Sequence, residues 1–442
     1  MDDLLAARSQ MAMSLGFHIL FAVVGMAMPL MSAIAEGMWL RTRDEGWKIL
    51  AQQWSRGTAI LFAVGAVSGT VLSFELGLLW PHFMEWAGPV IGMPFSLEGF
   101  AFFLEAIFLG LYLYGWRRLP PFIHWLTGIG VTLCGWASGV FVVAVNAWMN
   151  TPVGFTLEDG KVVDVDVWAA LFNPAMPTQV IHMLLAAVVT VGFGVAAIHA
   201  YMVLLDPASV FHRRAYLVGL VVGGVAAVLQ PLSGDFLAKQ VARNQPVKLA
   251  AMEAHWDTTT AAPLHVGGWP DEEREETRWA IKLPYGLSFL AYGDPHAEVR
   301  GLKEFPPEMR PPIWPVHVAF QVMVGAGTIL MGVAAAGALL GWARRSWLFS
   351  QHFLRCVILC GPLGVLALET GWVVTEVGRQ PWIITGHMRT ADALTPIPGL
   401  LVPFTLFSLL YVVLSVVVIQ LMRRRVIAAP HLTSPEVSHG LR

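Results

Sequence analysis

The chain has 442 residues, of which 56% are hydrophobic and only 13% are charged. Soluble domains carry roughly 25% charged residues, so the composition excludes an ordinary soluble protein and indicates an integral membrane protein. The formal net charge of −2 gives no basis for a nucleic-acid partner. The three cysteines show no zinc-site or disulfide pattern. The N-terminal stretch MDDLLAARSQ lacks a basic segment and a cleavage site, so we expect the first helix to be retained.

Nine apolar runs are long enough to span a bilayer, which requires about 20 residues. The sequence therefore predicts an all-α polytopic membrane protein with about nine transmembrane helices and one long periplasmic loop. The expected spans are 12–36, 55–79, 95–115, 123–146, 178–205, 214–236, 314–341, 353–376 and 400–422.

Basic residues alternate regularly between the connections. Connection 80–94 has no Lys or Arg and connection 147–177 has only Lys161, whereas the short connections that alternate with these two are basic. Basic residues accumulate on the cytoplasmic side of membrane proteins. The pattern therefore predicts a periplasmic N-terminus and a cytoplasmic C-terminus, which agrees with an odd number of spans. The basic positions are Arg41, Arg43, Lys48, Arg56, Arg117, Arg118, Arg213, Arg214, Arg344, Arg345, Arg355, Arg423, Arg424 and Arg425.

One long polar connection divides the chain into three expected parts. Residues 1–236 hold the first six helices, 237–312 form the periplasmic loop, and 313–442 hold the last three helices and a cytoplasmic tail. A long loop in a compact protein is usually functional or disordered, and a solvated loop remains an alternative. The stretch QPVKLAAMEAHW within this loop predicts a short helix that carries Lys248 and Glu253.

Several ionisable side chains lie inside the predicted spans, where a charge costs roughly 2.5–3.5 kcal/mol. Most lie in the outer half of their helix, so we expect them to gather near the periplasmic surface. A lone membrane histidine is more often a packing residue than a ligand, and a methionine in an apolar helix is usually part of the core. The candidates are His18, Glu98, Glu105, His182, His199, Glu369 and Glu376, with Met323 if heme is bound. His199 is the exception in depth, since we expect it near the cytoplasmic end of its helix.

Two pairs of glutamates share a seven-residue spacing, Glu98 with Glu105 and Glu369 with Glu376. Seven residues are nearly two helical turns, so each pair lies on one helix face about 10 Å apart. Protonatable groups along one face are typical of a proton path. The alternative is a pair of protonated, hydrogen-bonded acids with a structural role only.

Four motifs resemble those of a known family. They are ETGWVVTEVGRQPW, LEGFAFFLEA, NAWMNTP and KLAAMEAHW. The chain resembles subunit I of the cytochrome bd-type terminal quinol oxidases from about Ser9 to about Leu421, with an outer loop (the Q-loop) of the short kind. Cyanide-insensitive members of this group are included in the resemblance.

The resemblance implies three cofactors: a low-spin heme b, a high-spin heme b and heme d, with a third heme b as the alternative to heme d. It implies that His182 and Met323 ligate the low-spin heme. It implies that His18 and Glu369 serve the two high-spin hemes, without assigning His18 to either. The other expected roles are cofactor contacts by Arg379 and Trp372, proton delivery by Glu98 and Glu105, a path extended by Ser138 and Asn146, and quinol binding by Lys248 and Glu253.

The activity implied by the resemblance is quinol oxidation on the periplasmic side coupled to reduction of oxygen to water, with a proton motive force but no pump. Implied partners are a homologous second subunit, a small single-span subunit, quinol, oxygen and lipids of the bacterial inner membrane. The residues alone leave two alternatives, a diheme quinone oxidoreductase without oxygen chemistry and a proton-coupled transporter. Some family members carry arginine where this chain has Gln321. Neither the quinone type nor the oligomeric state follows from the sequence.

Overall fold

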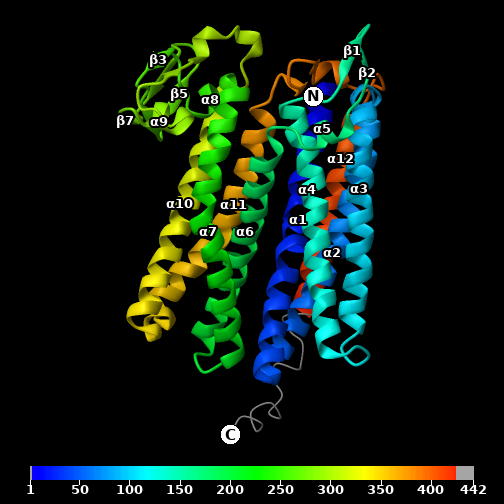
Figure 1. Cartoon of the computed structure of the whole chain (residues 1–442), viewed down its shortest axis with the longest axis vertical. Helices are drawn as coiled ribbons and strands as arrows, with labels where there is room; N and C mark the ends of the chain where they lie inside the picture. Colours follow the sequence, from blue (N-terminus) through cyan, green and yellow to red (C-terminus); the bar gives the residue numbers. More distant parts are fainter. Residues whose placement is uncertain (1, 425–442) are drawn as a thin grey trace. The chain divides into compact units, whose positions relative to one another are not determined.

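The computed structural model describes residues 2–424, and this range contains nine helices long and apolar enough to cross a membrane (Figure 1). This confirms the predicted all-α polytopic class. The nine are α1 (Asp3–Thr42), α2 (Glu45–Leu79), α3 (Pro81–Tyr114), α4 (Pro121–Asn150), α6 (Met176–Leu205), α7 (Val210–Asn244), α10 (Ile313–Ala343), α11 (Gln351–Val377) and α12 (Leu401–Met422).

Most of these helices extend beyond the apolar runs that predicted them. The largest difference is α3, which begins at Pro81 rather than near residue 95 and contains Pro89 and Pro94. Proline removes one helical hydrogen bond and usually marks a helix boundary in soluble proteins, but membrane helices tolerate it because neighbouring groups satisfy the freed backbone. Hydropathy detects only the segment in lipid, whereas the helical backbone continues past it.

The described residues divide into two compact units, and each is considered by itself. The first consists of Met1–Glu75, Leu104–Leu133 and the described part of Ile397–Arg442. Within it, Phe17 of α1 packs on Tyr411 of α12 with ring centroids 4.5 Å apart. The indole nitrogen of Trp125 in α4 donates to the carbonyl of Ala33 in α1 at 2.9 Å. The unit therefore joins α1, α12 and parts of α2, α3 and α4.

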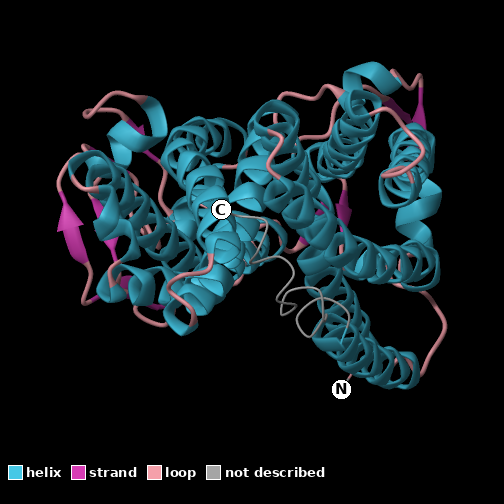
Figure 2. Cartoon of the chain, turned by 90° about the horizontal axis from the view of Figure 1, so that it is seen from below, coloured by secondary structure: helices cyan, strands magenta, loops and turns pink. Residues whose placement is uncertain are grey.

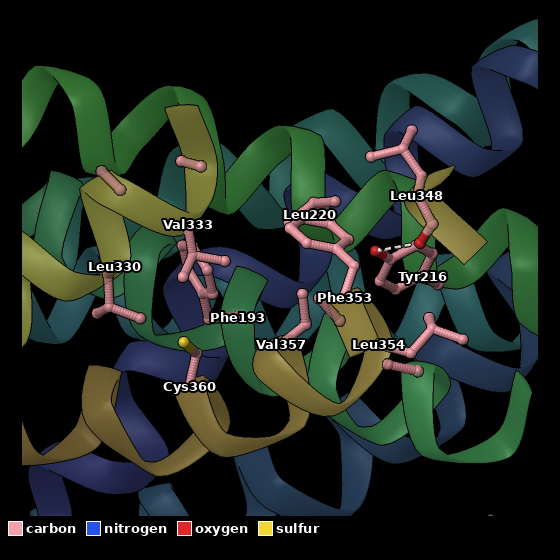
Figure 3. Close-up of a cluster of buried hydrophobic side chains, with 14 of the residues drawn as sticks. Phe193, Tyr216, Leu220, Leu330, Val333, Leu348, Phe353, Leu354, Val357 and Cys360 are labelled. Carbon is pink, nitrogen blue, oxygen red and sulfur yellow. Dashed lines mark hydrogen bonds between the residues drawn. The ribbon is translucent and has the colours of Figure 1, made fainter. Parts of the chain in front are cut away.

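The second unit consists of Leu76–Phe103 and Cys134–Pro396, and one of its apolar clusters joins α6, α7, α10 and α11. Phe193, Leu330 and Val357 are fully buried in this cluster, as Figure 3 shows. Helices α6 and α7 approach closely, because a Cβ on Gly192 would lie only 2.5 Å from the Cα of Gly223. Small residues at such crossings let the backbones pack closely, and this van der Waals contact holds membrane helices together where lipid provides no hydrophobic driving force.

Short elements connect the long helices, and Figure 2 shows the few strands among them. The strands of the described chain form two-stranded antiparallel sheets: β1 with β2, β3 with β8, β4 with β7, β5 with β6, and β9 with β10. Their bounds are β1 Thr156–Glu158, β2 Lys161–Val163, β3 Thr259–Thr260, β4 Leu264–Val266, β5 Trp269–Asp271, β6 Glu276–Arg278, β7 Ile281–Leu283, β8 Glu298–Val299, β9 Trp382–Ile384 and β10 Met388–Arg389. The short helices are α5 (Val167–Leu171), α8 (Pro246–Met252) and α9 (Gly286–Tyr292).

The long connection after α7 is folded. It contains α8, where a short helix was expected, together with α9 and strands β3 to β8. Leu249, Trp256, Leu287 and Leu302 are buried in a cluster that also includes Ile313 at the start of α10. An apolar core shared with α7, α10 and α11 distinguishes this segment from a purely solvated loop. The segment thus holds the residues on α8 in defined positions.

Candidate functional site

His182 lies on α6 with its ring held by α7. Its Nδ1 lies 2.9 Å from the Ser233 hydroxyl, and that hydroxyl donates its only proton to the Gln230 carbonyl at 2.8 Å. The hydroxyl oxygen must therefore accept from His182 Nδ1–H, which leaves Nε2 unprotonated, as a metal ligand must be. The amide nitrogen of Gln230 lies 3.1 Å from Nε2, as expected for a donor facing its lone pair.

His18 has the same arrangement between α1 and α2. Its Nδ1 lies 2.9 Å from the Ser68 hydroxyl, which donates to backbone carbonyls of Val64 and Gly65 at 3.0 and 3.1 Å. A Cβ on Gly69 would lie 3.0 Å from the imidazole, so this glycine makes room for the ring. Both histidines thus present an unprotonated Nε2, which is the form that binds iron.

Met323 and Glu369 lie on the adjoining helices α10 and α11. The Met323 sulfur is so close to α11 that a Cβ on Gly371 would approach it to 2.9 Å. Glu369, two residues away on α11, has a buried Oε1 without a hydrogen-bond partner. A thioether and an unpartnered carboxylate oxygen are both iron ligands by type. The expected ligand chemistry is therefore present in this unit. Trp372, a predicted cofactor contact, is half-buried on the same helix.

A polar network follows α11 at the start of the GRQPW sequence. Arg379 is 5% exposed and contacts Glu376 through Nη2 at 2.5 Å, while its Nε and Nη1 are buried without partners. Buried guanidinium donors require an acceptor, and a bidentate carboxylate fits them. The propionates of heme are such groups. Asn146 of α4 donates to Glu376 and so joins this network.

Lys248 extends the network toward α8. Its ammonium donates to the Asn150 side chain at 2.9 Å and to the Thr375 carbonyl at 3.2 Å. Burial, reinforced by the positive charge of Arg379, lowers the pKa of Lys248 to about 7. Close to neutral pH this side chain therefore exchanges between its charged and neutral forms, and it donates hydrogen bonds in both.

Glu253 occupies a separate buried position at the end of α8. Neither carboxylate oxygen has a hydrogen-bond partner, and burial raises the pKa of Glu253 to about 8. His265 donates through Nδ1 to the Glu253 backbone carbonyl at 3.0 Å, and His317 donates through Nδ1 to the Met252 carbonyl at 2.8 Å. The structure therefore places Lys248 in the network of Arg379, while Glu253 is buried in a segment whose backbone accepts from two histidines.

The glutamates of α3 have different surroundings. The Ser138 hydroxyl of α4 donates to Glu98 at 2.9 Å, so these two residues do lie together. Glu105 is 5% exposed in the first unit, and its Oε1 lies beside Gly25 of α1. Because His18 and Glu105 belong to the first unit and the other candidates to the second, the gathering of all of them near one surface stays a prediction.

Gln321 fixes the folded loop to α10. Its amide oxygen accepts from the Gly267 backbone at 2.9 Å, and its amide nitrogen donates to the His265 carbonyl at 3.0 Å. A neutral amide can make both bonds, whereas an arginine could only donate. This explains structurally why glutamine suits this position.

Sequence reasoning missed three buried polar groups. Glu36 and His124 are 0% and 2% exposed and contact each other at 2.7 Å, although the sequence position of His124 beside a loop suggested no special role. Glu75 is 0% exposed and accepts from Gln10 at 2.9 Å and Ser14 at 3.0 Å. An ionisable residue inside an apolar run was the available signal for Glu36 and Glu75.

The described residues form a helical membrane protein that carries imidazole, thioether and carboxylate side chains, which are types that ligate heme iron. The family model for cytochrome bd terminal oxidase subunit I matches residues 6–430, and the chain belongs to that family.

A solved structure and two sequence relatives cover nearly the whole chain. The bd oxidase from Geobacillus thermodenitrificans is 41% identical, with a TM-score of 0.91 over 96% of this chain and 99% of that one. A Bacillus subtilis (strain 168) protein provisionally named cytochrome bd menaquinol oxidase subunit I is 37% identical over 423 residues, 95% of each chain. A second protein of that strain, cytochrome bd ubiquinol oxidase subunit 1, is 32% identical over 444 residues, 96% of this chain and 94% of the relative.

Proposed function

We propose that this chain is the heme-binding subunit of a quinol:oxygen oxidoreductase in the respiratory chain of a bacterial cytoplasmic membrane. The observation that carries the proposal is the state of the two histidines. In each, a serine hydroxyl accepts from Nδ1–H, so that Nε2 is available to iron. Membership of the cytochrome bd family supports it. The basic connections favour a periplasmic N-terminus and a cytoplasmic C-terminus.

The side chains of this chain would hold three hemes. His182 and Met323 suit a low-spin heme b, whose ligands are two strong-field side chains. His18 and Glu369 suit the high-spin heme b and heme d. Arg379 has free donors for propionates. When bound, the hemes take electrons from quinol and deliver them to oxygen, which is reduced to water.

The loop supplies groups suited to quinol oxidation. Lys248 donates a hydrogen bond to a quinol oxygen. Glu253, once its carboxyl is ionised, accepts a proton from the quinol hydroxyl. Glu98, held by Ser138, and Glu105 accept and pass protons that enter from the cytoplasm. Protons are released outside and taken up inside, so charge is separated without a pump. A homologous second subunit completes the enzyme, and a small single-span subunit is a further expected partner.

The test is a reduced-minus-oxidised absorption spectrum of the purified complex, together with oxygen consumption driven by quinol. Heme b bands and quinol-dependent oxygen uptake are expected, and a band in the red region would identify heme d. Bands of heme b without oxygen uptake would instead favour a diheme quinone oxidoreductase, and absence of heme would favour a transporter.

Ligation of the low-spin heme is tested by Met323→Leu, with Met331→Leu on the same helix as the matched control. The first variant is expected to lose the low-spin signal, because a leucine cannot coordinate iron. The second is expected to retain it. Retention of the signal in Met323→Leu would show that another side chain is the ligand.

A further inference from the structure

Glu36 and His124 form a buried carboxyl–imidazole pair near one end of the first unit. His124 contacts Glu36 through Nδ1 at 2.7 Å and the Tyr112 carbonyl through Nε2 at 2.8 Å. The carbonyl can only accept, so Nε2 carries a proton. The remaining proton of the pair lies either on Glu36 or on Nδ1. The pair can therefore take up a further proton on Glu36 Oε2, and release it again, without breaking its own hydrogen bond.

The pair lies at the basic end of its helices. Helix α1 ends at Thr42, six residues and about 9 Å beyond Glu36. The α1–α2 turn carries Arg43, and Arg41 and Lys48 lie in the helical turns that flank it. Basic connections face the cytoplasm. The pair thus lies close to the side from which an oxidase draws its protons.

A small cavity lies beside this pair within the unit. It offers about 10 Å³ of space for the centre of a water molecule, on the order of what one water requires. Four of its lining side chains carry hydroxyls. Those of Ser32 and Tyr112 are buried without a hydrogen-bond partner, while Ser55 and Thr58 donate to backbone carbonyls and keep lone pairs free. Such a lining offers water both donors and acceptors.

The residues that line the cavity lie between the pair and Glu105 along α1 and α3. On α1, Ser32 is one turn from Glu36, and Pro29 is one turn from Gly25, beside which Glu105 lies. On α3, Leu109 of the lining is one turn from Glu105. Glu36 and Gly25 are eleven residues apart, about 16 Å along α1, and the lining residues occupy the intervening turns.

An additional acceptor lies at the inner end of this route. Pro29 has no N–H, so the carbonyl of Gly25 lacks its usual helical partner. Glu105 Oε1 lies 3.6 Å from the Cβ position of Gly25. The polar groups therefore continue to the level of Glu105.

We infer that Glu36 and His124 are the proton-loading pair of a path within this chain that leads through the hydroxyl-lined cavity to Glu105. The inference rests on the proposed oxidase function. No covalent step is involved: a proton is received by the pair, relayed by the hydroxyls and water, and delivered to the Glu105 carboxylate. The path lies within one subunit and in one compact unit of the described chain.

The experiment uses the complete purified complex, reduced anaerobically with quinol and mixed with oxygen in the presence of a pH-indicating dye. Glu36→Gln keeps the size of the side chain but cannot carry the proton, and proton uptake is expected to slow at least tenfold. Glu36→Asp is expected to restore part of the rate. Glu45→Gln, a carboxylate outside the path that accepts from Trp39 at 3.0 Å, is the matched control and should be unaffected.

Tyr112→Phe is the second variant, because it removes a buried hydroxyl of the cavity lining beside Glu36 and keeps the aromatic ring. Proton uptake should slow here too, with normal heme absorption and normal anaerobic heme reduction by quinol. An infrared difference spectrum should show a carboxyl band that Glu36→Gln removes.

The outcomes separate this inference from the function on which it rests. If the unmodified complex consumes no oxygen with quinol, the oxidase proposal fails. If it does, and both variants take up protons at the unmodified rate, only the path is refuted. Loss of heme in Glu36→Gln combined with normal uptake in Tyr112→Phe would also refute the path, since the pair would then be structural.

Discussion

Replacing Glu253 with glutamine should remove an alkaline rise in the rate of quinol oxidation. The side chain is 0% exposed, and burial raises its pKa from 4.5 to about 8. That difference corresponds to about 5 kcal/mol at 1.36 kcal/mol per pH unit. Because the pKa is raised, the carboxyl is protonated at low pH and becomes a proton acceptor only as the pH rises through about 8.

The expected magnitude follows from the ionised fraction of this carboxyl, which increases from roughly one tenth at pH 7 to roughly nine tenths at pH 9. Quinol oxidation should therefore accelerate close to tenfold over this range. Burial lowers the pKa of His255 and His265, so the neighbouring imidazoles are already neutral there. Lys248, with a pKa of about 7, completes most of its titration before Glu253 does.

The assay is anaerobic stopped-flow reduction of the bound hemes by quinol between pH 6 and pH 9.5, which avoids reaction of quinol with oxygen. Glu253→Gln should give a flat profile and a rate lower by roughly 10²-fold, the lower bound for loss of a general base. Glu298→Gln, an exposed carboxylate on β8 of the same loop, should behave like the unmodified protein. A rise of equal size in Glu253→Gln, or a flat profile without any substitution, would refute the assignment.

Four further substitutions test the rest of the site. Ser233→Ala removes the acceptor that orients His182 and should weaken binding of the low-spin heme about 10–100-fold. The measurement is heme b per protein after gel filtration, and full retention of heme would contradict the role of Ser233. Arg379→Lys keeps the charge but loses the planar fork, so we expect a shifted heme midpoint potential in a redox titration, and an unchanged potential would argue against propionate binding. Glu98→Gln should slow oxygen consumption by roughly 10²-fold and Ser138→Ala by less, with heme reduction by quinol normal in both; slowed heme reduction would place Glu98 on the quinol side instead.

Much of the architecture could be predicted from the sequence. Lipid cannot hydrogen-bond to the backbone, so each spanning segment must be an apolar helix. Hydropathy accordingly located all nine membrane-length helices of the described range. The same solvent makes every retained charge or metal-capable side chain conspicuous. His18, His182 and Glu369 could therefore be singled out one helix at a time, and the motif resemblance added Met323.

Only the tertiary structure decided which groups surround those side chains. The serine that fixes the tautomer of His18 lies 50 residues away in sequence, and that of His182 lies 51 residues away. Glu36 finds His124 across 88 residues, and no local pattern on either helix announces the pairing. The hydropathy of a segment reflects its own free energy of transfer from water to lipid, so it can be read from that segment alone. The protonation state and the partners of a buried group depend instead on which neighbouring helix faces it. That facing is set by packing, here by close approaches such as Gly69 beside His18.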